Sequence, residues 1–224
     1  MTGIVDSIKI VKEKIEKACG KAGRDPGEVT LVAVTKTVEA EKIEAAIQYG
    51  LKHFGENYVQ EAKAKIDHIN NKEISWHMIG YVQTNKVKYI SGRFDFIHSV
   101  DRWELLEGLD KYCKPMKALF ELNLSKETTK HGIDEDGLRR LLEKVDSLQY
   151  IKPVGLMTMA PYVDDPEKVR AIFSTLRKTL EKMNREFSRD MKELSMGMSS
   201  DFEVAIEEGA TMVRVGTALF GERI

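Results

Sequence analysis

The residues best suited to chemistry lie in the C-terminal stretch 195–224, SMGMSSDFEVAIEEGATMVRVGTALFGERI. Ser199 and Ser200 precede one helical pattern, and Gly216 with Thr217 opens a second, shorter one after a β-branched run. A helix N-terminus offers free N–H groups and the positive end of the helix dipole, and small or hydroxyl residues leave room for an anion. The segment therefore predicts a phosphate-binding site.

Two cations stand at unusual places for charged side chains. Lys36 follows the apolar run LVAVT, and Arg214 interrupts the apolar segment MVRVGT. The ordinary interpretation of Lys36 is a lysine extending from a strand end into solvent. The functional one is an amine whose pKa falls through desolvation, so that it can attack a carbonyl. Arg214 stays charged and must find an acceptor or reach the mouth of the fold.

Two further polar residues accompany them. Asn57 and Gln60 fit a capping box, which would explain both without a ligand, but Asn57 also follows a predicted strand. Ser200 and Glu203 fit a second capping box. His77 lies within a predicted strand, where a lone histidine is more often an interior group than a catalyst.

Strand and helix patterns alternate along the whole chain after an opening amphipathic helix that ends near Gly23. The alternation favours a single (β/α)8 TIM-barrel domain over residues 1–224 with an extra N-terminal helix. An open doubly wound sheet is the alternative, but no G-x-G-x-x-G follows a strand. The predicted strands are 31–35, 53–55, 76–79, 94–98, 116–122, 154–157, 193–195 and 212–215, and the predicted helices between them are 39–49, 57–69, 84–91, 101–112, 134–147, 166–188 and 200–208.

Composition narrows the classes of function. The net charge of −1 gives no bulk attraction to nucleic acid or anionic membranes. The chain lacks a secretory signal pattern and an apolar run of about 20 residues. Cys19 and Cys113 are far apart, with no metal-ligand spacing, which indicates a reduced, cytoplasmic protein without a metal.

The chain resembles the pyridoxal phosphate homeostasis protein family, barrel proteins related to the N-terminal domain of alanine racemase. The similarity runs from about residue 5 to the C-terminus. It rests on the motifs LVAVTK, HFGENYVQEA, WHMIGYVQTNK, SKETTKHGI, GLMTMAP and LSMGMSSDFEVAIEEGATMVRVGTALFG. Tyr81 stands where many relatives have proline, and His131 where some have serine.

The resemblance implies that pyridoxal 5′-phosphate is the cofactor and that Lys36 forms the Schiff base with its aldehyde. It also implies that Ser199, Gly216 and Thr217 hold the phosphate. Arg214 would face the pyridine nitrogen, with Asn57 and His77 lining the ring pocket.

The function implied is that of a non-enzymatic carrier or regulator in intracellular vitamin B6 and amino-acid homeostasis. Its expected partners are amino acids and apo-enzymes that use pyridoxal phosphate, and the expected state is a monomer. Arginine disfavours the protonated ring that makes the cofactor a strong electron sink. Racemases of this relationship also carry a second domain with a catalytic tyrosine, and no residues remain for one after Ile224. A weak pyridoxal-phosphate-dependent amino-acid racemase and a phosphosugar isomerase or aldolase remain as alternatives.

Overall fold

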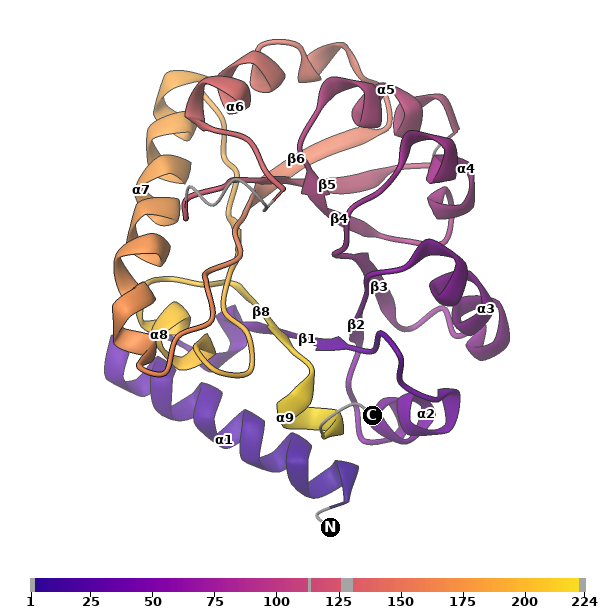
Figure 1. Ribbon diagram of the computed structural model, residues 1–224, viewed down its shortest axis with the longest axis vertical. Helices are drawn as coiled ribbons and strands as arrows, with labels where there is room; N and C mark the ends of the chain where they lie inside the picture. The colour runs from indigo at the N-terminus through magenta and orange to yellow at the C-terminus, as the bar shows by residue number, and fades with distance from the viewer. Residues whose placement is uncertain (1–2, 113, 126–130, 222–224) are drawn as a thin grey trace.

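The eight strands close into a barrel in which each strand pairs with the next in the chain and β8 pairs with β1, always in parallel. The computed structural model describes residues 3–112, 114–125 and 131–221. Figure 1 looks along the barrel, with the helices arranged outside the ring of strands. The predicted (β/α)8 fold is confirmed, and the open doubly wound sheet is wrong.

The strands agree with the predicted segments to within a few residues. They are β1 (Thr30–Val34), β2 (His53–Glu56), β3 (Ser75–Met78), β4 (Phe96–Val100), β5 (Met116–Glu121), β6 (Ile151–Met157), β7 (Glu193–Ser195) and β8 (Met212–Val215).

The helices are amphipathic and pack their apolar faces against the strands. The α-helices are α1 (Ile4–Ala22), α2 (Ala40–Gln48), α3 (Val59–Ile69), α4 (Val87–Ile90), α5 (Trp103–Tyr112), α6 (Glu135–Leu142), α7 (Arg170–Glu186), α8 (Phe202–Glu207) and α9 (Thr217–Phe220). Short 3₁₀ turns occupy Pro26–Glu28, Thr84–Lys86, Val145–Ser147 and Pro166–Val169. Helix α1 is the predicted extra helix; it packs against α8, α9 and α2 and ends at Gly23, whose φ of 65° is left-handed.

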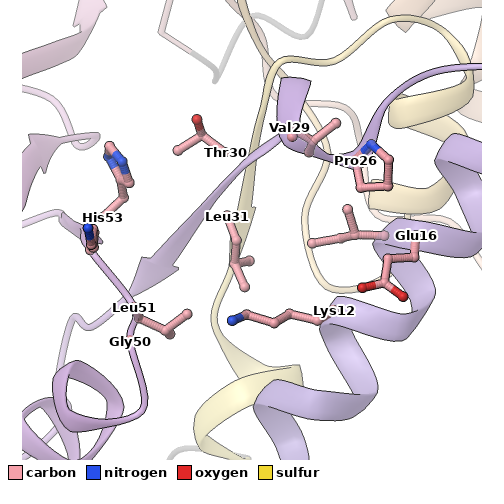
Figure 2. A pocket seen from close by; sticks show the side chains of 12 residues that line it. Lys12, Glu16, Pro26, Val29, Thr30, Leu31, Gly50, Leu51 and His53 are labelled. Atoms are coloured by element: carbon pink, nitrogen blue, oxygen red, sulfur yellow. The ribbon is translucent and has the colours of Figure 1, made fainter.

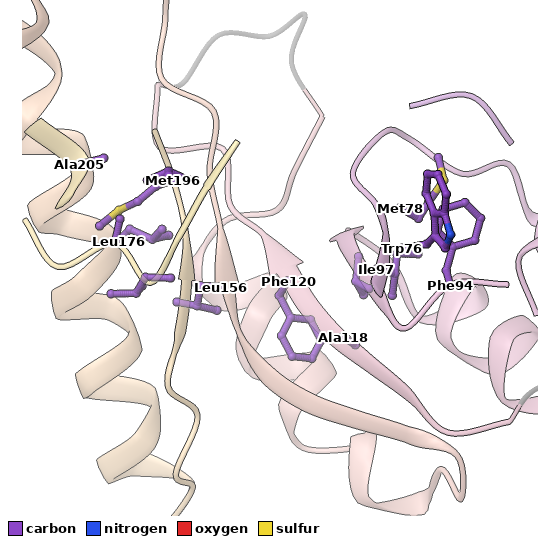
Figure 3. Close-up of a cluster of buried hydrophobic side chains, with 14 of the residues drawn as sticks. Trp76, Met78, Phe94, Ile97, Ala118, Phe120, Leu156, Leu176, Met196 and Ala205 are labelled. Atoms are coloured by element: carbon purple, nitrogen blue, oxygen red, sulfur yellow. The ribbon is translucent and has the colours of Figure 1, made fainter. Parts of the chain in front are cut away.

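The core has two parts because successive strand residues point to opposite faces of the sheet. The larger part lies between strands and helices. In Figure 3, Phe120 of β5 and Leu156 of β6 belong to it, together with Leu176 of α7. The smaller part comes from residues of opposite parity on the inner face of the barrel: Val32, Phe96, Leu119, Met157 and Met212. The barrel is therefore filled by side chains.

Both predicted capping boxes are wrong. Helix α8 begins after Asp201, whose carboxylate accepts from the main-chain N–H of Met198 at 2.6 Å, and no side chain caps the helix. Helix α3 begins after Tyr58, again without a side-chain cap. Ser200 and Asn57 therefore do not cap these helices, so the capping role predicted from the sequence does not explain either residue.

Some sequence features fall outside the described residues: Cys113 and residues 126–130 of the SKETTKHGI segment. Within the described part of the chain, no helix combines the length and the apolar character needed to cross a membrane.

Candidate functional site

A cavity of about 650 Å³ lies at the C-terminal ends of the strands, where active sites of this fold are built. It brings together six of the seven predicted cofactor-binding residues: Lys36, Asn57, Ser199, Arg214, Gly216 and Thr217. His77 is absent from its lining. The other lining residues are Val34, Ile79, Met159, Tyr162, Met198, Ser200 and Ala218.

Lys36 reaches this cavity because β1 ends two residues before it. Val34 is the last strand residue, and Thr35 is still fully buried, whereas the Lys36 side chain is half-buried. The lysine therefore emerges from the core directly at the barrel mouth. An amine at such a position is available to a ligand in the cavity.

Arg214 lies on β8, is 4% exposed, and lines the same cavity on the side of the barrel interior. Its guanidinium donates to the hydroxyl of Ser195 at 2.6 Å and to the main-chain carbonyl of Thr158 at 2.9 Å. Burial lowers the pKa of Arg214 to about 10, while the carboxylates of Glu121 and Asp201 oppose that change. At neutral pH the side chain remains a cation.

Ser199 contacts a set of main-chain hydrogen-bond donors. Its hydroxyl oxygen accepts from the N–H of Gly216 at 3.2 Å and of Ala218 at 3.3 Å. Gly216 is the N-cap residue of α9, so these N–H groups belong to the first turn of a helix. An anion at the Ser199 hydroxyl would meet the same two donors.

Asn57 follows β2 and has a buried side-chain oxygen without a hydrogen-bond partner among the described residues. Its main chain lies against Gly80, where an added Cβ would come within 2.3 Å of the Asn57 carbonyl oxygen. A glycine at position 80 is therefore required for this close approach. The unpaired amide oxygen is an acceptor available to a donor in the cavity.

The structure does not support the expected place of His77 in the ring pocket, because this residue is fully buried inside the barrel. It belongs to a hydrogen-bonded chain. His53 Nδ1 contacts His77 Nε2 at 3.0 Å, and His77 Nδ1 contacts His98 Nε2 at 2.8 Å. His98 Nδ1 then contacts the hydroxyl of Ser195 at 2.8 Å, and Ser195 accepts from Arg214. This chain connects His77 to Arg214, which lines the cavity.

The direction of this chain follows from Arg214, which can only donate. Ser195 accepts from Arg214, and among the described residues His98 Nδ1 is the acceptor within reach of the Ser195 hydroxyl, so the Ser195 proton goes to His98. Each histidine then carries its proton on Nε2 and donates to the next one, ending at His53. Burial lowers the pKa of all three histidines, and that of His77 and His98 falls well below 6.5, in agreement with neutral rings.

A second cavity, of about 440 Å³, lies at the opposite end of the barrel (Figure 2). It is lined by Thr30 and Leu31 at the start of β1, by Lys12 of α1 and by His53. Loops at this end of the fold serve stability rather than catalysis. We therefore place the functional site at the larger cavity, which contains Lys36.

Three features of the rim were not predicted from the sequence. Met159 and Tyr162 follow β6 and line the cavity, and Tyr162 is 82% exposed. Their position just after a strand is a signal that the barrel rule could have used. Tyr81 and His131, the two departures from the family pattern, stack on each other with ring centroids 4.2 Å apart. The two unusual residues therefore form a single contact.

Comparisons with known proteins identify the family of the chain. The family described as alanine racemase, N-terminal domain, matches residues 9–224. The chain is 45% identical to a pyridoxal phosphate homeostasis protein of Aquifex aeolicus, over 95% of both chains. It is 39% identical to one of Pseudomonas aeruginosa, over 100% of this chain and 97% of the other.

Comparison with solved structures points to the same family and fold. PipY of Synechococcus elongatus, solved with PLP bound, has a TM-score of 0.82 and 36% identity, covering 93% of this chain and all of PipY. Alanine racemase of Corynebacterium glutamicum has a TM-score of 0.70 at 16% identity, covering 98% of this chain and 61% of the racemase, and shows the fold alone. The chain belongs to the pyridoxal phosphate homeostasis protein family, within the alanine racemase N-terminal domain family.

Proposed function

We propose that this protein binds pyridoxal 5′-phosphate through Lys36 and acts as a carrier and regulator in vitamin B6 and amino-acid homeostasis, not as an efficient enzyme. The observation that carries the proposal is the single cavity containing Lys36, Arg214 and the Ser199 donor set. The names of the curated relatives and the PLP-bound structure of PipY support it.

The residues present fit this cofactor. Its aldehyde condenses with a lysine amine to give a carbon–nitrogen double bond and one water molecule, and Lys36 is the lysine in the cavity. Ser199, Gly216 and Thr217 would hold the phosphate, since Ser199 already accepts from the main-chain N–H groups there. Arg214 would face the ring nitrogen, and Asn57 would offer its unpaired oxygen.

Arg214 argues against strong catalysis. A carboxylate beside the ring nitrogen favours the protonated ring and a strong electron sink, whereas a guanidinium disfavours it. Both donor bonds of Arg214 to Ser195 and Thr158 hold the cation in place. The site is therefore less suited to stabilising carbanions than a site with a carboxylate beside the ring nitrogen, which restricts the chemistry that the cofactor could support.

Borohydride reduction followed by peptide mapping tests the attachment. We expect covalent label at Lys36 and loss of the visible absorption band in Lys36→Ala. Dominant label elsewhere, for instance at Lys130, would refute this assignment.

The phosphate contacts have their own test. Ser199→Ala combined with Thr217→Ala should weaken binding of pyridoxal phosphate far more than that of pyridoxal. Each charge-assisted hydrogen bond lost is worth roughly 1.5–3 kcal/mol. Equal losses for the two ligands would place the phosphate elsewhere.

Tyr162 favours the racemase as a second candidate. It is a phenol that lines the cavity, and general acid–base groups contribute about 10²–10⁴-fold to rates. A panel of amino acids decides between the candidates. Turnover above about 1 s⁻¹, the low end of ordinary enzyme rates, that is lost in Tyr162→Phe would replace the carrier by the enzyme.

The proposal includes exchange with amino acids, transfer of cofactor to apo-enzymes, a monomeric state and a cytoplasmic location. The free, buried thiol of Cys19 supports a reducing compartment. Spectral shifts on adding amino acids, reactivation of an apo-enzyme, light scattering and cell fractionation test these four points in turn.

A further inference from the structure

The main chain on the N-terminal side of Lys36 is held by a partly buried lysine. Lys65 of α3 is 11% exposed, and its ammonium donates to the main-chain carbonyl of Thr35 at 2.5 Å. The same ammonium donates to Glu56 at 3.0 Å and to Glu61 at 2.5 Å. All three of its protons therefore have acceptors.

The two carboxylates extend this contact to both sides of Lys36. Glu56, fully buried at the end of β2, accepts from the hydroxyl of Thr35 at 2.7 Å. Glu61 accepts from the main-chain N–H of Thr37 at 2.5 Å. Residues 35 and 37, the neighbours of Lys36, are thus tied to one ion cluster.

Thr37 gives a reason for such a cluster. Its φ of 58° is left-handed, which is unusual for a β-branched residue. Strain of this kind corresponds to about a five- to 150-fold change in population, and it persists only where surrounding contacts impose it. The turn that carries Lys36 into the cavity therefore depends on contacts outside its own sequence.

We propose that Lys65, Glu56 and Glu61 are positioning residues that clamp the backbone on both sides of Lys36 and direct its amine into the cavity. The inference rests on the proposed function, because it assigns the clamp a role in covalent attachment at Lys36. Burial raises the pKa of Glu56, and the Thr35 hydroxyl and Lys65 lower it, so the lysine helps to keep the carboxylate charged.

The test variant is Lys65→Met, which keeps most of the side-chain length and removes the donors. Lys63→Met is the matched control, since Lys63 lies on the same helix and pairs with Asp67 on the exposed surface at 2.8 Å. Purified protein is mixed with pyridoxal phosphate, reduced with borohydride at timed intervals and mapped for label at Lys36. Melting temperature without ligand is measured in parallel.

We expect covalent attachment to be at least about tenfold slower in Lys65→Met, within the range of the strain at Thr37, and unchanged in Lys63→Met. Adding Thr37→Gly to Lys65→Met should restore the rate to within about threefold of that of Thr37→Gly alone, because glycine adopts φ of 58° readily. A rate that is unchanged in Lys65→Met, falls equally in Lys63→Met, or is not restored by glycine overturns the clamp. A lower melting temperature with an unchanged attachment rate also overturns it.

Hydrogen exchange separates this inference from the proposed function. In ligand-free protein, a peptide containing residues 35–38 should exchange at least about fivefold faster in Lys65→Met than in wild type or Lys63→Met. Absence of label at Lys36 in wild type refutes the proposed function alone. Unchanged exchange in Lys65→Met refutes the clamp, whether or not the cofactor binds.

Discussion

Glu121 makes the stability of this protein depend on pH in a direction that can be derived from its surroundings. It ends β5, is 4% exposed, and burial raises its pKa from 4.5 to about 7. Arg214 lowers this pKa and Asp101 raises it, and both effects are smaller than that of burial. The folded state therefore holds the Glu121 proton more tightly than the unfolded state does.

The sign of the effect follows from that difference. Between pH 4.5 and about 7 the folded state binds more protons, so the free energy of unfolding decreases as the pH rises through this window. One pKa unit corresponds to about 1.36 kcal/mol, so ionising Glu121 costs roughly 3 kcal/mol by pH 8. Glu121→Gln, which is neutral at every pH, escapes that cost.

Urea unfolding at pH 5, 6, 7 and 8 measures this prediction. Glu121→Gln should gain about 2.5 kcal/mol relative to wild type between pH 5 and pH 8, or roughly 5–10 °C in melting temperature for a chain of this size. Glu13→Gln, which removes a charge from the exposed face of α1, should show no such gain. Other titrating groups cancel in the difference between wild type and variant. Stability curves that remain parallel across this range would refute the reasoning.

Three further predictions concern the framework of the site. Gly155→Ala should destabilise the fold by more than about 3 kcal/mol, measured by urea unfolding, because its Cβ would come within 1.9 Å of the Glu193 carbonyl oxygen on the paired strand. Phe173→Ala, on the buried face of α7, should cost about 3–5 kcal/mol in the free energy of unfolding, against less than about 0.5 kcal/mol for Tyr112→Ala at an exposed position. Nitrogen NMR of the histidine side chains should show His98 neutral between pH 5 and 8 with its proton on Nε2; a charged ring there would contradict the derived direction of the chain.

The strands were predictable because their residues are buried on both faces and form short apolar, β-branched runs. The early start of β6 was missed because Pro153 argues against a strand. The structure accommodates this proline at a register shift between Ala118 and Leu119 of the neighbouring β5. A bulge of this kind depends on the partner strand, which the local sequence does not contain.

The histidine chain could not be predicted, since it depends on the register between strands. His77 pairs with Gly55, two residues beyond His53, and Phe96 pairs with His77, two residues before His98. Each of the two later histidines thus lies two residues further along its strand than the residue that pairs with the preceding histidine. The three side chains therefore occupy successive levels on the inner face of the barrel. A single strand reveals only one of them, which looks like a lone interior histidine.

The cavity residues were predictable for a different reason. Lys36, Asn57 and Arg214 each lie in a predicted strand or within two residues of its end, and the parallel barrel gathers such positions at one rim. The predicted capping box at Ser200 is wrong because α8 begins after Asp201, whose carboxylate accepts from the Met198 N–H, and the one at Asn57 is wrong because α3 begins after Tyr58. Ends of strands are therefore more reliable guides to this site than ends of helices.

Arg214 lines the cavity and, through Ser195, also contacts the histidine chain inside the barrel. Below it, the chain through Ser195 is made of neutral groups, so these hydrogen-bond partners bring no charge opposite to that of the guanidinium. Its opposite charges, Glu121 and Asp201, are carboxyls whose own pKa burial raises. Because their pKa values are raised, Glu121 and Asp201 offset the charge of Arg214 less than two groups with ordinary pKa values would. A phosphate bound at the main-chain donors beside Ser199 would place its negative charge in the same cavity as the Arg214 guanidinium, so the cation and the N–H groups would favour an anionic cofactor together.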